Sequence, residues 1–298
     1  FVIPQFKSAG INIDINKPWN LNIYGDNIYI GNNVHFRTSR NIITQICSWN
    51  KNNANAKISI GDNVLISPGV RIIAAKNITI EKNVNIGPFT VLEDNVKIKS
   101  GSAIGSNCFI GHGTTIGSNS KIMSSVNIYS LVRIGKNCTI HSGSVIGADG
   151  YGFYTHKDIH YKIPQNGKVN VGNDVEIGAN CTIDRGTIDD TLIGDMCKFD
   201  NGVQIGHNVE IGKGCLLTAH VTIAGSSKIG DFCIFGGQSG AIDHVTIGDR
   251  AIFACYTVAM KDLPGGKTYS GSPAREIKEK YSYCCKDLIK EFAKWDKK

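Results

Sequence analysis

Residues 80–146 read IEKNVN IGPFTV LEDNVK IKSGSA IGSNCF IGHGTT IGSNSK IMSSVN IYSLVR IGKNCT IHSGSV I, so every sixth residue from Ile80 to Ile146 is Ile or Leu. A six-residue period of this length indicates an internal repeat, and a repeat decides the architecture before any other feature does. Gly and Asn, which tolerate the left-handed backbone of sharp corners, follow many of the aliphatic residues. Each hexad therefore predicts a short strand and a corner.

Three hexads close one triangular coil of 18 residues, with the aliphatic side chain pointing inward onto its counterpart one coil away. The period returns at Val171, runs in a second phase from Ile193 to Ala259, and occupies a third phase from Ile60 to Ile78. At about 4.8 Å per coil, roughly ten coils would form a prism on the order of 48 Å long. The predicted fold is all-β, a hexapeptide parallel β-helix whose hand the periodicity alone does not determine.

The sequence predicts three parts. Residues 1–79 form N-terminal β-helix coils with an excursion loop at residues 37–56, and residues 80–268 form the main hexapeptide β-helix. In residues 269–298, Ser272-Pro273 can start a helix, and the apolar residues beyond it recur at helical spacing. We expect a C-terminal amphipathic α-helix, which carries eight basic and five acidic residues from Arg275 onward.

A second break in the period, residues 147–168, reads GADGYGFYTHKDIHYKIPQNGK and holds two histidines and several tyrosines. Such an aromatic segment could cover a ligand. It could equally be a surface loop that packs its own rings together, because loops between repeats run over the surface. Composition leaves both alternatives open.

Composition excludes several classes of protein. Of the 298 residues, 41% are hydrophobic and 19% charged, which is enough apolar material for a core and too little charge for a disordered chain. The longest nearly apolar run, Ala251 to Met260, is about half as long as a membrane helix, so we expect no integral membrane segment. The net charge of +7 suits an acidic partner or an anionic substrate. No basic and aromatic motif accompanies it, so we expect no nucleic-acid binding.

Cysteines follow the repeat. Six of the ten occupy the slot two residues before the large aliphatic residue, where Val, Thr and Ser otherwise stand: Cys108, Cys138, Cys181, Cys197, Cys215 and Cys233. We interpret them as small buried hydrophobic residues. No Cys-x-x-Cys pair occurs, so no metal site is expected. Unpaired thiols favour a reducing compartment, and the predicted location is cytoplasmic.

Four longer segments carry a family resemblance: IHSGSVIGADGYGF at 140–153, TIDRGTI at 182–188, DNGVQIGHN at 200–208 and YSGSPA at 269–274. Together with the hexads between them, they resemble the UDP-3-O-acylglucosamine N-acyltransferases of lipid A biosynthesis. The resemblance implies a left-handed β-helix that assembles as a homotrimer, with active sites between neighbouring prisms. It also implies transfer of an acyl group from a thioester to the amine of a nucleotide sugar.

By the same resemblance, His207 is the general base, Gly225 provides an oxyanion N–H, and His244 is a second functional histidine. Asp200 and Asn201 match the family motif and would orient the substrate or His207. The chemistry needs these groups, because an amine that attacks a thioester must lose a proton and the carbonyl oxygen becomes negative.

Repeat arithmetic supports the same grouping independently. Residues 18 apart lie one above another, which places Gly225 over His207, and Asp243, next to His244, over Gly225. The competing interpretation is that a histidine at a prism corner is a solvated turn residue. We interpret His112 and His141 in that way.

The N-terminal region departs from the resemblance, because residues 1–79 do not resemble the uridine-binding domain that precedes the prism in that family. Residues 58–87 instead resemble coils of coenzyme-A-dependent sugar O-acetyltransferases. Two enzyme hypotheses follow: acyl-carrier-dependent N-acylation of a UDP-glucosamine derivative, and coenzyme-A-dependent acetylation of an amino sugar. A non-enzymatic scaffold is the third hypothesis. In either enzyme the thioester, on acyl carrier protein or coenzyme A, is a co-substrate, and no bound cofactor is expected.

Overall fold

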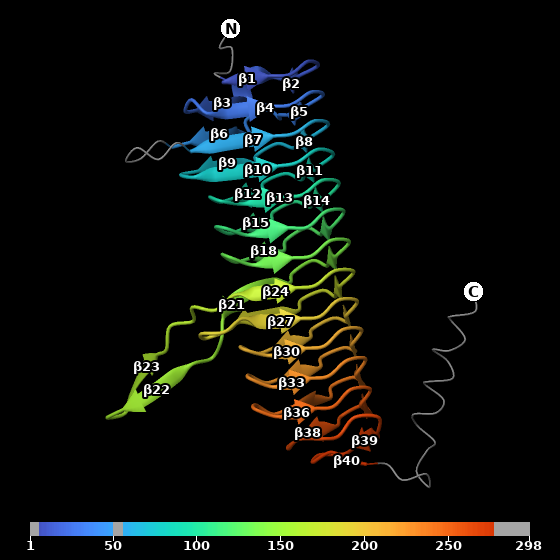
Figure 1. The fold of residues 1–298 in the computed structure, drawn as a ribbon. Coiled ribbons are helices and arrows are strands. Elements are labelled where there is room, and N and C mark those ends of the chain that lie inside the picture. Colours follow the sequence, from blue (N-terminus) through green and yellow to red (C-terminus); the bar gives the residue numbers. More distant parts are fainter. Residues whose placement is uncertain (1–5, 50–55, 277–298) are drawn as a thin grey trace, which may run out of the picture.

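The computed structural model describes residues 6–49 and 56–276, which form a three-sided prism of stacked coils (Figure 1). Each coil contributes one strand to each of three sheets, called A, B and C, before the chain rises to the next coil. Figure 1 shows the coils in sequence order from the N-terminal end of the prism to the C-terminal end. The predicted parallel β-helix is confirmed.

The strands are two to five residues long. Sheet A holds, in order, β1 Ser8–Ala9, β4 Ile28–Ile30, β7 Lys57–Ile60, β10 Asn77–Ile80, β13 Lys97–Ile98, β16 Thr115–Ile116, β19 Arg133–Ile134, β24 Val169–Val171, β27 Thr191–Ile193, β30 Glu210–Ile211, β33 Lys228–Ile229 and β36 Thr246–Ile247. Sheet B holds β2 Asp14–Asn16, β5 His35–Arg37, β8 Leu65–Ile66, β11 Asn85–Ile86, β14 Ala103–Ile104, β17 Lys121–Ile122, β20 Thr139–Ile140, β25 Glu176–Ile177, β28 Lys198–Phe199, β31 Leu216–Leu217, β34 Ile234–Phe235, β37 Ile252–Phe253, β39 Thr268–Ser270 and β40 Arg275–Glu276.

Sheet C holds β3 Leu21–Tyr24, β6 Thr44–Ser48, β9 Arg71–Ala74, β12 Val91–Leu92, β15 Phe109–Ile110, β18 Asn127–Ile128, β21 Val145–Asp149, β26 Thr182–Arg185, β29 Gln204–Ile205, β32 Thr222–Ile223, β35 Gly240–Ala241 and β38 Val258–Ala259. A separate hairpin is formed by β22 Phe153–His156 and β23 Ile159–Lys162, and a short 3₁₀ helix, η1, spans Pro18–Asn20.

The core is a set of stacked aliphatic rows inside the prism. Ile98 pairs in register with Ile116, and Ile116 with Ile134, so identical side chains lie one above another. All three are almost fully buried, and the six cysteines of the small slot are buried beside such rows. The inward positions predicted from the hexad period are therefore confirmed.

The N-terminal coils extend the prism further than the hexad period predicts. Within the described residues sheets A and C each hold twelve strands, so the expectation of roughly ten coils is wrong. The hexad period does not reveal the first coils, because their corners are longer. Ser8 pairs with Tyr29, 21 positions on, and Ile28 pairs with Ile58, 30 positions on, instead of with residues 18 positions away. The predicted excursion at residues 37–56 is wrong in part, because β6 lies inside it and pairs with β3 and β9.

The C-terminal end of the prism is closed by strands. The predicted helix start at Ser272-Pro273 is wrong, because β39 and β40 form an antiparallel pair there. Tyr269 on β39 is 2% exposed and packs against Phe253, and its hydroxyl donates to Pro264 O at 2.7 Å. This burial and the sheet hydrogen bonds outweigh the local capping signal. The rest of the predicted helix, residues 277–298, lies outside the described residues, and none of the described helices is long and apolar enough to cross a membrane.

Candidate active site

The strands of sheet C end at a corner that leads into sheet A, here called the C–A corner. His207 follows β29 at this corner, Gly225 follows β32, and His244 follows β35. Backbone hydrogen bonds join the three coils: Ser226 N donates to His207 O at 2.8 Å, and His244 N donates to Gly225 O at 3.0 Å. The structure therefore brings these three candidate residues into one column, in the order expected from the 18-residue coil.

The imidazole of His207 is partly buried and lies between two glycines. A Cβ atom at Gly225 would stand 2.7 Å from Nε2 of His207, and a Cβ atom at Gly150 would stand 2.5 Å from the Cβ of His207. A side chain at Gly225 would require the ring to move, and one at Gly150 would require the backbone to move, because real contacts are longer than this. The two glycines thus make room for the ring, and its Nε2 edge faces Gly225.

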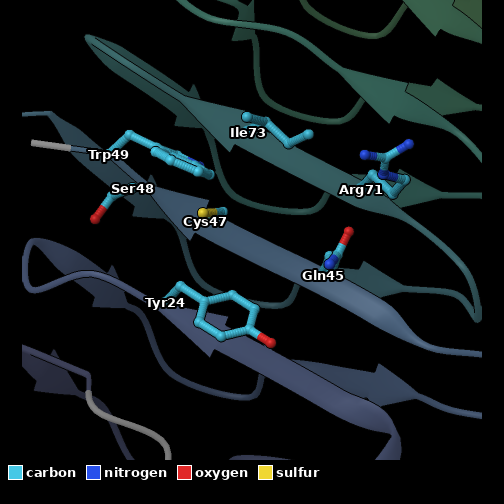
Figure 2. Close-up of a pocket in the computed structure, with 7 residues that line it drawn as sticks. All are labelled: Tyr24, Gln45, Cys47, Ser48, Trp49, Arg71 and Ile73. Carbon is cyan, nitrogen blue, oxygen red and sulfur yellow. The ribbon is translucent and has the colours of Figure 1, made fainter. Parts of the chain in front are cut away.

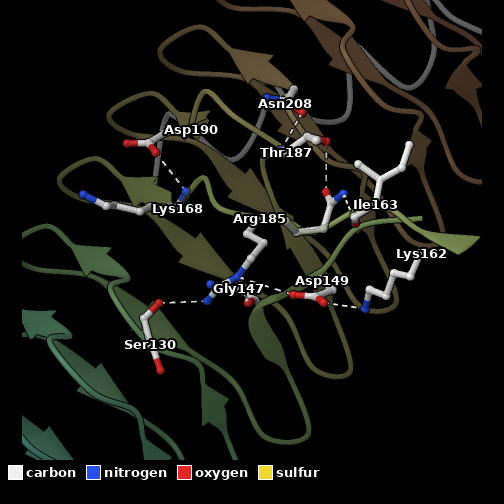
Figure 3. A network of polar contacts seen from close by, with 11 residues as sticks. Ser130, Gly147, Asp149, Lys162, Ile163, Lys168, Arg185, Thr187, Asp190 and Asn208 are labelled. Carbon is white, nitrogen blue, oxygen red and sulfur yellow. Dashed lines mark hydrogen bonds and ion pairs between the residues drawn. The ribbon is translucent and has the colours of Figure 1, made fainter. Parts of the chain in front are cut away.

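A hydrogen bond determines which nitrogen of His207 carries the proton. Nδ1 lies 3.1 Å from Oδ1 of Asn208. The orientation of the Asn208 amide is fixed, because Thr187 N donates to its Oδ1 at 2.9 Å (Figure 3). Its Nδ2 donates to Asp189 O, also at 2.9 Å. An amide oxygen can only accept, so a neutral His207 carries its hydrogen on Nδ1. Nε2 is then left with a lone pair, which is what a general base needs.

The N–H of Gly225 is a free donor beside that lone pair. Within the described residues it has no hydrogen-bond acceptor, as at several other corners, whereas at some corners the equivalent N–H donates to a side chain of the next coil. Lys213 N, for example, donates to Asp231 Oδ1 at 3.0 Å. An unpaired N–H that needs no reorganisation can stabilise a negatively charged oxygen, so Gly225 has the property that an oxyanion donor requires.

Asp200 and Asn201 lie at a different corner, between β28 and β29, where sheet B leads into sheet C. Both are exposed; Asn201 N donates to Asp200 Oδ1 at 2.7 Å, and Asn201 Oδ1 accepts from Ala179 N at 2.7 Å. Strand β29 separates this corner from His207. The structure therefore does not bring Asp200 and Asn201 to the His207 column within one chain.

The break at residues 147–168 is a hairpin, here called the arm, that extends away from the prism in Figure 1. Its strands β22 and β23 are exposed along their whole length. Its rings pack on each other: Tyr154 stacks on Tyr161 with ring centroids 5.1 Å apart, and Tyr151 lies 5.3 Å from Phe153. In a single chain the arm packs its own rings together, and its root, at Gly150, lies against His207.

Arg185 holds the root of the arm in place (Figure 3). Its guanidinium, only 13% exposed, donates from Nε to Gly147 O at 2.7 Å and from Nη2 to Ser130 O at 2.8 Å. Asp149 lies 4.0 Å from the same guanidinium and also pairs with Lys162 of the arm. Gly147 and Asp149 lie just before Gly150 in the sequence. This network therefore determines the position of Gly150 against His207.

Replacing Arg185 with Met is expected to lower the free energy of unfolding by about 3 kcal/mol, because two backbone carbonyls lose charged donors that water replaces poorly. Urea denaturation followed by circular dichroism measures this change. Lys162→Met is the matched control, since it removes only a pair whose partners are more than 40% exposed, and it should change stability by less than about 1 kcal/mol. Equal losses in both variants would contradict the anchoring role.

Asp184 is a further acidic group at the site, and sequence reasoning missed it although it stands in the TIDRG segment. Its pKa is raised to about 6, mainly because it is buried; a hydrogen bond from Gln204 and the charge of His207 lower the pKa in part, and the charge of Asp149 adds to the rise. The 18-residue spacing did not predict this neighbourhood, because extra corner residues make the offset larger here. Thr182, for example, pairs with Gln204, 22 positions on.

A groove of about 530 Å³ lies elsewhere on sheet C, over β3, β6 and β9 (Figure 2). Its walls are formed by Tyr24, Gln45, Cys47, Ser48, Trp49, Arg71 and Ile73. Seven strand steps of sheet C separate β6 from β29, which is roughly 34 Å at about 4.8 Å per step. The groove is therefore separate from the His207 column in the same chain.

Comparison with protein-family models finds hexapeptide repeats. Residues 77–112, 113–148 and 190–225 match the model described as "Bacterial transferase hexapeptide (six repeats)", and residues 168–207 match "Hexapeptide repeat of succinyl-transferase". These matches cover the coils that hold His207, Gly225 and Asp184.

Curated relatives share the same region. The chain is 40% identical over 134 residues to a UDP-3-O-acylglucosamine N-acyltransferase of Methylobacterium nodulans, which is 45% of this chain and 38% of that protein. It is 42% identical over 145 residues to the enzyme of that name from Campylobacter concisus, which is 48% of this chain and 46% of that protein. The match thus spans less than half the length of these curated relatives.

Solved structures with the same fold include the UDP-N-acetylglucosamine O-acyltransferase of Moraxella catarrhalis, with a TM-score of 0.60, 26% identity, and coverage of 69% of this chain and 77% of that one. The UDP-N-acetylglucosamine acyltransferase of Francisella novicida superposes with a TM-score of 0.57, 28% identity, and coverage of 63% and 67%. The expected left-handed winding of the β-helix agrees with these neighbours.

Proposed function

We propose, from the hexapeptide repeats that the family models match over residues 77–148 and 168–225, that the chain is an acyltransferase that N-acylates a UDP-3-O-acylglucosamine-type sugar in lipid A biosynthesis. The observation that carries the proposal is the geometry of His207: Nδ1 is occupied by Asn208, and the basic Nε2 lies against Gly225, whose N–H has no acceptor within the described residues. The names of the curated relatives support the choice of sugar.

In the proposed reaction the amine nitrogen of the sugar attacks the carbonyl carbon of a thioester. As the C–N bond forms, the amine proton passes to Nε2 of His207, and the N–H of Gly225 stabilises the negative carbonyl oxygen. The C–S bond then breaks, and the imidazolium returns the proton to the departing sulfur. The products are an amide and a free thiol, and His207 is neutral again.

Asp200 and Asn201 can act at the site of His207 only in an assembly of several chains. We propose a homotrimer of parallel prisms, in which the corner that holds Asp200 and Asn201 of one chain faces the His207 column of its neighbour. Their position away from His207 in the single chain supports this arrangement, and His244 lies in the column where it can bind substrate. Sedimentation should give about three times the chain mass of 32.2 kDa. A stable monomer with full activity would contradict the proposal.

Acyl carrier protein is the proposed donor, because the chain carries a net charge of +7 and carrier proteins are acidic. The eight described cysteines are free thiols, which supports the proposed cytoplasmic location. The alternative function is acetylation of an amino sugar from acetyl coenzyme A. It is favoured by residues 58–87, whose sequence resembles coenzyme-A-dependent sugar acetyltransferases.

One assay distinguishes the two functions. The purified chain is incubated with UDP-3-O-acylglucosamine and hydroxyacyl carrier protein, and in parallel with acetyl coenzyme A and a panel of nucleotide amino sugars, while thiol release is followed. Release with the carrier substrate is the expected result. Release only with acetyl coenzyme A would assign the alternative function, and release with neither donor would contradict both.

A further inference from the structure

The groove over β3, β6 and β9 has an aromatic, apolar end. Cys47 of β6 lies at its centre, and the in-register partners of Cys47 on the flanking strands are Tyr24 and Ile73. Figure 2 shows the indole of Trp49 on one side of Cys47 and the ring of Tyr24 on the other. Tyr24 is 52% exposed and Trp49 is 59% exposed, so both rings are uncovered where they line the groove. Exposed aromatic side chains that line a hollow are typical of a ligand site.

The width of this end is sufficient for one planar ring. Tyr24 and Ile73 stand two strand steps apart, which is about 9.6 Å at the usual strand spacing. A ring that contacts a wall on each of its faces occupies about 7 to 8 Å, and two stacked rings would need more than 10 Å. One ring therefore fits over Cys47, with a side chain against each face.

The other end of the groove is polar and positively charged. Gln45 of β6 and Arg71 of β9 are paired in register there, two residues before Cys47 and Ile73. Two residues along a strand span about 6.6 Å. The groove thus offers a ring-binding end and a cationic end at a separation of roughly 6 to 7 Å along the strands.

The charge of Arg71 is not neutralised by a neighbour within residues 6–49 and 56–276. Among the arginines of that part of the chain, only Arg37 and Arg185 form ion pairs, and none of the residues that line the groove is acidic. Glu93, which follows β12 on the next strand, accepts a hydrogen bond from His112 N at 3.0 Å, one coil further from Arg71. The exposed guanidinium is therefore available to an anionic ligand.

We propose that this groove binds a nucleoside monophosphate, with the base between Tyr24 and Ile73 and the phosphate on Arg71. Aromatic side chains bind bases by stacking, and a planar guanidinium donates two parallel hydrogen bonds to a phosphate. The sugar of such a molecule separates base and phosphate by a distance similar to that between the two ends of the groove. Gln45 can donate to and accept from its polar groups.

This is a second site, because roughly 34 Å separate the groove from the coil of His207 in the same chain. Binding there requires no acyl transfer, so the inference goes beyond the proposed function and does not depend on it. An assay of binding alone, without a thioester, tests it separately.

The test is titration of the full chain with uridine and adenosine monophosphates, followed by calorimetry and by tryptophan fluorescence. We expect a dissociation constant below about 1 mM and quenching of Trp49. Trp49→Phe keeps a ring in place and should abolish the quenching but not the heat of binding. Arg71→Gln should weaken binding about tenfold or more through loss of the charged donor, and Tyr24→Ser about tenfold through loss of stacking.

Matched controls remove the same groups elsewhere on the prism. Arg133→Gln removes another exposed arginine, on β19, and Tyr256→Ser removes a ring that is 71% exposed; both should leave the affinity unchanged. Because Arg71 and Tyr24 are exposed, their exchange removes little packing, and circular dichroism checks the fold.

The unaltered chain gives an independent result, since uridine alone and inorganic phosphate alone should each bind at least tenfold more weakly than the nucleotide. Equal affinity for either fragment would overturn the proposal. So would the absence of nucleotide binding, or binding that Arg71→Gln and Tyr24→Ser leave unchanged. Binding of phenylpropanoate, an aromatic carboxylate, in place of the nucleotides would overturn the assignment of ligand. Trp49 fluorescence that changes with chain concentration while no nucleotide binds would show that a second copy of the chain fills the groove.

Discussion

Exchange of His207 for Ala is expected to lower turnover by about a hundredfold or more while the chain remains folded. The variant removes Nε2, which in the structure is the basic nitrogen because Asn208 occupies Nδ1. The ring is only partly buried and lies between glycines, so its loss removes little packing. Initial rates of thiol release measure the effect, and circular dichroism checks the fold.

His141→Ala is the matched control for this experiment. His141 stands at another corner of the prism and contacts Glu176 at 3.3 Å, with 41% of its side chain exposed. Its exchange should leave turnover within about twofold of the unaltered chain. Retention of most activity in folded His207→Ala would show that His207 is not the base, and imidazole added to that variant should restore part of the rate if it is.

Exchange of Gly225 for Ala is expected to reduce turnover by about a hundredfold with little loss of stability. The added Cβ would stand 2.7 Å from Nε2 of His207, so the methyl group must displace the ring from the space in which the amine would approach. A displacement of about 1 Å is enough for a loss of this size. Gly225 is not among the residues with positive φ, so Ala meets no backbone strain there.

Gly237→Ala is the control, because a Cβ atom at Gly237 meets its nearest neighbour only at 3.7 Å. It adds the same methyl group at a different corner and should leave turnover unchanged. If both glycine variants keep full activity, the space over Gly225 is not where the reaction takes place. If both lose activity in proportion to their stability, the effect is one of folding.

Most of the fold could be predicted because the repeat is local. An inward residue recurs every sixth position, so Ile98, Ile116 and Ile134 could be placed in one row before the structure was known. Coils with longer corners, such as the one that pairs Ile28 with Ile58, break the period and were missed. The strands β39 and β40 were missed for another reason: the local helix signal at Ser272-Pro273 competes with a sheet edge that only the stacked prism provides.

By itself the sequence determined the coils and the column of His207, Gly225 and His244, because a constant offset of 18 residues translates directly into stacking. Only the tertiary structure decided which other groups meet His207. Asp184 and the root of the arm at Gly150 lie near it across insertions that change the offset between coils, and Asn208, its neighbour in sequence, reaches Nδ1 through the direction of its side chain. The structure also placed Asp200 and Asn201 at another corner. The physical reason is that periodicity specifies which side chains point inward, whereas contacts at corners depend on the hydrogen-bonded register and on side-chain direction, which no repeat encodes.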